Sequence, residues 1–131
     1  MTQDLKMLRN DLLRLHGALL AAERDAHERQ YGRVAPGEML QMLINDENFQ
    51  WLRPISGLVA DIDEALAEER KGEPALNDEA KAALLLRARA VVEPDATLVD
   101  RYRAWLQDAP DVLLAHRAVV GHLRQPAPLI N

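Results

Sequence analysis

The side chains best suited to bind a ligand gather in one short segment, Phe49 to Glu64. Trp51 and Arg53 come just before and after Leu52 in this segment, and Asp63 lies near its acidic end. An aromatic ring, a guanidinium and a carboxylate together are typical of a pocket for a small polar molecule or a partner's side chain. The competing interpretation is packing, with Trp51 in the core and a partly buried Asp63 paired with Arg53 or with an arginine of the fourth predicted helix. Both interpretations fit the sequence.

His116 is the side chain best placed for proton transfer, because it falls between Leu113 and Val120 on an apolar helical stripe. Histidine changes charge near neutral pH and serves as a general acid or base. With the three residues above it would line the pocket of a small-molecule-binding or enzymatic bundle. A histidine at the edge of the core, bonded to a carbonyl or a carboxylate, gives the same pattern. The chain has no glycine-rich phosphate loop and no nucleophile beside an evident base, so we predict no catalytic residues.

Metal and thiol chemistry find little support in the sequence. With no cysteine, the chain cannot use thiol nucleophiles, disulfides or cysteine-ligated metals. Glu23 and His27 are spaced to share a helix face and could hold a divalent cation. Because Arg24 and Arg29 lie beside them, a surface network of salt bridges is the favoured interpretation. We predict no bound metal and no cofactor.

The charge distribution indicates which partners the chain favours. The net charge is −5, and residues 34–72 hold eight acids against three bases. The electrostatic field of this negative charge repels phosphate groups and argues against nucleic acid as a partner. The arginines of the final third are balanced by acids and form no basic stripe: Arg101, Arg103, Arg117 and Arg124. The acidic region either attracts a basic protein partner or is a solvated surface.

The sequence also bears on the chain's location. No run approaches the roughly 18 apolar residues that cross a bilayer, so we predict no membrane span. Charged residues interrupt the stretch from Met1 to Asn10, which therefore does not match a secretory signal. We expect a cytoplasmic protein.

Apolar spacing predicts a long first helix and two that follow it. The first helix, from about Gln3 to Gln30, carries a heptad seam that Leu13 and Leu20 widen into a bundle face. The seam residues are Leu5, Leu8, Leu12, Leu15, Leu19, Ala22 and Ala26. A second helix starts at Pro36 and ends in a turn at residues 45–48, and a third runs from Pro54 to about Lys71. The expected buried face of the second helix comprises Met39, Leu40, Leu43 and Ile44.

The rest of the chain is also expected to be helical. Asn77 is the predicted N-cap of a fourth helix that runs to Val92 and is apolar around nearly its whole circumference. Such a helix either lies among its neighbours or covers a partner subunit, and we expect a mixture of the two. Two further helices span Asp95 to Leu123 with a break at Pro110, and residues 125–131 form an extended tail.

The segment from Phe49, with residues 36–40 before it, resembles a family of small uncharacterised bacterial helical proteins. The shared pattern is Phe-x-Trp-Leu-Arg-Pro-x-Ser followed by Ile-Asp-Glu, which this chain matches between Phe49 and Glu64. The resemblance implies a small helical protein with no assigned biochemical function. It supplies no catalytic residues.

Together these patterns predict an all-α fold, a mostly antiparallel bundle of five to six helices with a long N-terminal helix, in one domain spanning residues 1–131. The favoured function is a non-catalytic cytoplasmic bacterial interaction or regulatory module. Because the first and fourth predicted helices are more apolar than one small chain can easily cover, we expect a homodimer through one of them. The alternative is a small-molecule-binding or enzymatic bundle with its pocket near Trp51, Arg53 and Asp63.

Overall fold

The computed structural model describes residues 2–72, 77–92 and 100–124 of the chain, and every regular element in these ranges is helical. The elements are α1 (Thr2–Tyr31), α2 (Pro36–Asn45), α3 (Glu47–Gln50), α4 (Arg53–Arg70), α5 (Asp78–Val92), α6 (Asp100–Asp108) and α7 (Pro110–Arg124). The all-α prediction is confirmed, as is the long N-terminal helix. None of the helices in these ranges is long and apolar enough to cross a membrane.

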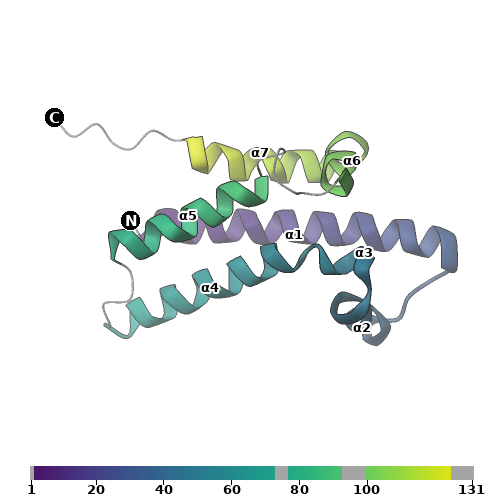
Figure 1. Ribbon diagram of the computed structural model, residues 1–131, viewed down its shortest axis with the longest axis horizontal. Helices are drawn as coiled ribbons and strands as arrows, with labels where there is room; N and C mark the ends of the chain where they lie inside the picture. The colour runs from purple at the N-terminus through teal and green to yellow at the C-terminus, as the bar shows by residue number, and fades with distance from the viewer. Residues whose placement is uncertain (1, 73–76, 93–99, 125–131) are drawn as a thin grey trace.

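Helix α1 is the spine of the bundle (Figure 1). Helices α4 and α7 pack along it and both run antiparallel to it. Helix α5 packs against α4 and α7, and α6 contacts α7 and α1. At 30 residues and about 1.5 Å per residue, α1 extends roughly 45 Å and contacts α3, α4, α6 and α7.

The leucines of the predicted α1 seam are buried as expected, whereas its two alanines, Ala22 and Ala26, are half-buried. Its five leucines, 0–1% exposed, form the centre of the main core: Leu5, Leu8, Leu12, Leu15 and Leu19. Leu13, which was expected to widen this face, is 45% exposed because neither α4 nor α7 covers that side of the helix. The helix ends at Tyr31, and Gly32 follows with a φ of 92°, a left-handed conformation that glycine adopts without strain.

Helices α2 and α3 form a smaller unit at the far end of α1. Helix α2 begins at Pro36 as predicted, but its packed face is turned: Met39 is buried, whereas Leu40 and Ile44 are exposed. The reason is that α2 packs only toward a second apolar cluster made by Val34, Met39 and Phe49. The expected turn at residues 45–48 is also wrong in part, because α3 starts at Glu47 after a one-residue break.

The remaining helix boundaries follow local signals in the sequence. Helix α4 begins at Arg53 with Pro54 in its first turn, and Gly72 follows it with a φ of 82°. Asn77 caps α5 as predicted, since its Oδ1 accepts the Ala80 N–H at 2.7 Å. The break between α6 and α7 lies at Ala109, one residue before the predicted position, and Pro110 begins α7. The predicted start at Asp95 and the extended tail lie outside the described residues.

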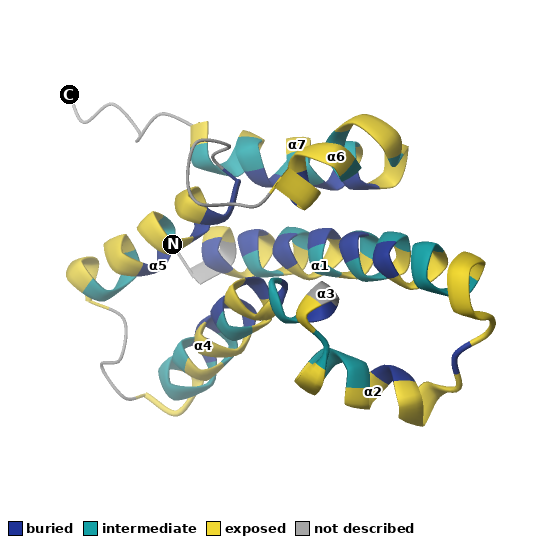
Figure 2. Ribbon diagram, turned by 45° about the vertical axis from the view of Figure 1, so that its right-hand side comes forward, coloured by how far each residue is buried: buried dark blue, intermediate teal, exposed yellow. Residues whose placement is uncertain are grey.

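Helix α5, the fourth predicted helix, is covered on one face only (Figure 2). Its buried residues are Leu84, Ala88, Val91 and Val92. The exposed apolar residues of the opposite face are Ala82, Ala83, Leu86 and Ala90. The apolar circumference predicted from the sequence therefore leaves an uncovered apolar strip on this helix.

Candidate functional site

The main polar feature of the interior is the carboxylate of Glu23, whose side chain is 1% exposed. Trp51 donates its Nε1–H to Glu23 Oε2 over 2.9 Å. Arg101 donates from Nε to the same oxygen at 2.6 Å and from Nη2 to Oε1. The guanidinium and the carboxylate therefore form a bidentate pair. The negative charge, which would be costly to bury alone, is thus neutralised by a cation and three N–H groups.

Each partner of Glu23 comes from a different part of the chain. Glu23 projects from the second half of α1, Trp51 lies between α3 and α4, and Arg101 lies in the first turn of α6. Hydrogen bonding to Glu23 raises the pKa of Arg101, and the charges of Glu23 and Asp46 add to this. The carboxylate therefore joins α1, α6 and the α3–α4 junction at one point.

The contacts continue from Trp51 to His116 through Tyr102. The Trp51 and Tyr102 rings meet edge to face with their centroids 6.2 Å apart. The Tyr102 hydroxyl lies 2.8 Å from Nδ1 of His116. Burial raises the pKa of Tyr102 and lowers the pKa of His116, which the charges of Arg117 and Arg124 lower further. The lowered pKa favours the neutral imidazole, which shares one hydrogen bond with the Tyr102 hydroxyl through Nδ1.

We call these five residues the interior polar chain: Arg101, Glu23, Trp51, Tyr102 and His116. The structure brings two of the predicted site residues, Trp51 and His116, into it. The predicted partner of His116 was a carbonyl or a carboxylate, but its partner is the hydroxyl of Tyr102. His116 does lie at the edge of the core, as the packing interpretation expected.

The other two predicted residues lie elsewhere. Arg53 donates from Nη2 to the backbone oxygen of Ile44 at 2.5 Å, at the end of α2. Asp63 accepts two bonds from Arg9 of α1, at 2.7 and 3.2 Å. The predicted pairing of Asp63 with Arg53 or with an arginine of α5 is therefore wrong, because α1 packs on that side of α4. The α5 residue Arg87 bonds Asp61 instead, at 2.7 Å.

Glu23 was misassigned by the sequence reasoning, which placed it with His27 in a surface network. The two side chains separate: Glu23 turns inward to Arg101, and the ring of His27 lies 6.2 Å from that of Phe49. A signal for burial was present. Glu23 follows Leu5 by 18 residues, which is five full turns at about 3.6 residues each, so both lie on the same buried face.

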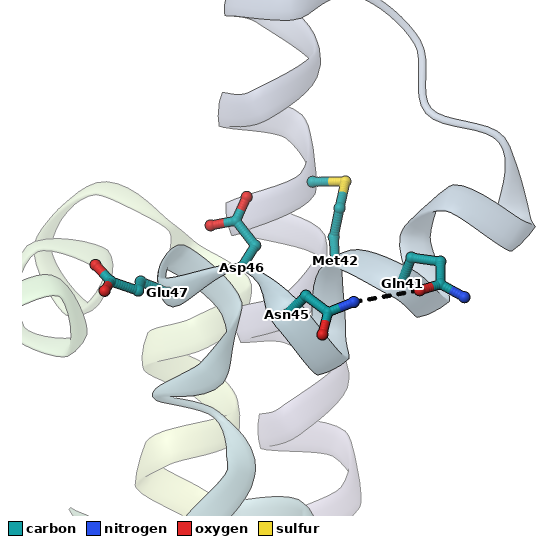
Figure 3. A pocket seen from close by; sticks show the side chains of 5 residues that line it. All are labelled: Gln41, Met42, Asn45, Asp46 and Glu47. Carbon is teal, nitrogen blue, oxygen red and sulfur yellow. Dashed lines mark hydrogen bonds between the residues drawn. The ribbon is translucent and has the colours of Figure 1, made fainter.

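An open hollow of about 570 Å³ lies beside the start of α3 (Figure 3). Its lining residues are Gln41, Met42, Asn45, Asp46 and Glu47; Asp46 and Glu47 lie toward one side, Gln41 lies toward the other, and Asn45 bonds Gln41. None of the four predicted site residues lines it. Three of its five lining residues are exposed and two are half-buried, so the hollow does not shield a ligand from water. Within the described ranges, no three histidine or acidic side chains are placed to share a metal ion.

The interior polar chain predicts a pH dependence of stability. The folded chain holds His116 below its ordinary pKa of 6.5, so the unfolded chain binds the proton more tightly. This contribution is therefore complete above pH 6.5, and the free energy of unfolding falls as the pH drops below that value. His16, whose pKa burial also lowers, acts in the same direction.

The measurement is urea unfolding of wild type and His116→Gln from pH 7.5 to 5. The variant keeps a hydrogen-bond acceptor for Tyr102 but does not titrate, so its stability should fall less steeply. His27→Gln, outside the interior polar chain, is the control and should follow wild type. Equal slopes for wild type and His116→Gln would refute the assignment.

Comparison of the chain with protein-family models, curated proteins and solved structures found no match in any of the three. The resemblance of residues 36–64 to a bacterial helical family stays a prediction. Functional interpretation therefore depends on the contacts and exposed surfaces of the chain's own residues.

Proposed function

We propose that this chain is a non-catalytic helical interaction module of the bacterial cytoplasm that self-associates as a homodimer through α5. The observation that carries the proposal is the uncovered apolar strip of α5, which we define as Ala82, Ala83, Leu86 and Ala90. Leu86 is 68% exposed at its centre. The helix is packed on its opposite face, so the strip is available on a rigid support.

The spacing of these residues favours a helix partner. Ala82, Leu86 and Ala90 recur every four positions and therefore form a continuous row along α5. The exposed face of a bundle helix is ordinarily charged or polar. Here the small alanine side chains lie on both sides of a single leucine, so a second helix can approach the backbone of α5 closely.

The interior polar chain supports a non-catalytic role. Its groups with acid–base chemistry bond to one another, with Tyr102 on His116 and three N–H donors on Glu23. Glu23 is buried, and its oxygens already have donors. Such an arrangement is typical of side chains that hold helices in place.

The proposal also allows a basic partner protein. Two acids of α4 are neutralised within the chain, since Asp61 bonds Arg87 and Asp63 bonds Arg9. Residues 36–50, which include α2 and α3, hold Glu38, Asp46 and Glu47 and no lysine or arginine. Residues 36–50 therefore contribute acids and no bases to the acidic region that favours such a partner.

The test of self-association is the molar mass in solution. Light scattering and sedimentation equilibrium over a wide concentration range should give a mass that rises from 14.7 kDa toward twice that value. Leu86→Lys places a charge in the strip and should hold the chain at the monomer mass. The matched control is Leu114→Lys on α7, because Leu114 is 64% exposed but does not lie on α5. A wild type that stays monomeric throughout would overturn the proposal.

The alternative is a small-molecule-binding bundle, which one contact favours. Arg53 bonds the oxygen of Ile44, the neighbour of Asn45, and Asn45 lines the hollow. A saturable quench of tryptophan fluorescence by a metabolite, lost in Arg53→Ala with the fold intact, would support this alternative over the interaction module.

A further inference from the structure

The strip on α5 has a direction, because its two ends carry opposite charges. Asp78 and Glu79 lie in the first turn of the helix, and Arg89 lies in its last turn. All three are exposed. Two copies of α5 packed in parallel would place acids against acids and arginine against arginine. Packed antiparallel, each acidic end meets the partner's arginine.

The sizes of the side chains favour the same arrangement. Leu86 projects from the strip, whereas Ala82 and Ala83, one turn earlier, leave a notch. In a parallel pair Leu86 would face its own copy, and the notch would stay unfilled. In an antiparallel pair, the two-fold axis can cross α5 at the level of Leu84 along the helix. Leu86 of each copy then enters the notch of the other.

We propose that two copies of the chain pair through antiparallel α5 helices, with Leu86 in the partner's Ala82–Ala83 notch and Glu79 near the partner's Arg89. This inference rests on the proposed self-association and specifies its geometry. The contact is isologous, so the same strip serves both copies and the assembly closes at two. The antiparallel helix dipoles add to the charge match.

Charges within each copy leave this contact available. Arg87, the other arginine near the strip, already bonds Asp61 of its own chain. Within the described residues, Arg89 donates to the backbone oxygen of Leu123 over 3.4 Å, which is a neutral acceptor. In the proposed pair, Glu79 of the partner supplies a carboxylate near Arg89. Raising the salt concentration should therefore weaken the dimer.

Because the chain has no cysteine, single cysteines report the geometry without interference. Near the two-fold axis, Ala83→Cys places the two cysteines only about 4 Å apart along the helices, at roughly 1.5 Å per residue. A disulfide requires β-carbons within about 4.5 Å, and side-chain adjustment brings this pair together. Ala90→Cys places its two cysteines about 17 Å apart along the same direction, too far to bridge.

The experiment is oxidation of each variant at a concentration where wild type is dimeric, followed by non-reducing electrophoresis. We expect a covalent dimer from Ala83→Cys and none from Ala90→Cys. Cross-linking of both variants would indicate a parallel pair and overturn the inference. A dimeric wild type in which neither variant cross-links would overturn α5 as the interface while leaving self-association intact. A monomeric wild type would refute the proposed function itself.

Discussion

Replacing Arg101 with methionine will lower the free energy of unfolding by about 3 kcal/mol, because it leaves the buried carboxylate of Glu23 without its counter-charge. Only the Trp51 N–H would remain on that carboxylate among the bonds described. Removing one partner of a buried ion pair costs about 3–5 kcal/mol, and the lower end applies since the Arg101 side chain is partly exposed. The measurement is urea unfolding, which leaves the ionic strength unchanged.

Two further variants separate this effect from a general loss of arginine. Arg103→Met removes an exposed arginine from the same helix and should change stability by less than about 0.5 kcal/mol. Adding Glu23→Gln to Arg101→Met removes the stranded charge while keeping an acceptor for Trp51. The double variant should therefore be more stable than Arg101→Met alone. If it is less stable, the carboxylate is not the source of the cost.

Replacing Leu12 with alanine will destabilise the bundle by about 2–5 kcal/mol. Leu12 is fully buried on the seam of α1, where α4 and α7 both pack. Truncation removes apolar contacts and leaves a cavity that these long helices cannot close by moving independently. A lowered urea midpoint with an unchanged slope would report the loss.

Leu13→Ala provides the matched control. It makes the same chemical change one position along α1, at a side chain that is 45% exposed. Its cost should be below about 1 kcal/mol, because water already reaches part of that side chain. Equal costs at the two positions would mean that the buried face of α1 is not the one described.

The backbone of this fold was largely predictable because its signals are local. Apolar spacing identified the leucine seam of α1, and Gly32, Pro36 and Asn77 marked helix ends through conformations and hydrogen bonds of their own neighbourhood. Leu40 and Ile44 were misplaced for a related reason. Periodicity finds the apolar side of a helix, but the neighbouring elements decide which part of that side is covered.

The interior polar chain was harder to predict, since its members are far apart in sequence. Glu23 is separated from Trp51 by 28 residues and from Arg101 by 78. Only the packing of α6 beside α1 brings that arginine to the carboxylate. Trp51 and His116 were singled out by residue type and position, but nothing in their spacing indicated that Tyr102 lies between them.

The two separate apolar clusters have a consequence for how the chain opens. The unit of α2 and α3 is held mainly by Val34, Met39 and Phe49, apart from the main core along α1. A small cluster at the end of a long helix can come loose as a local unfolding unit while α1, α4 and α7 stay folded. Glu38, Asp46 and Glu47 lie on this unit, so a partner that binds its released form would have to overcome only the free energy of this local opening and not the global free energy of unfolding.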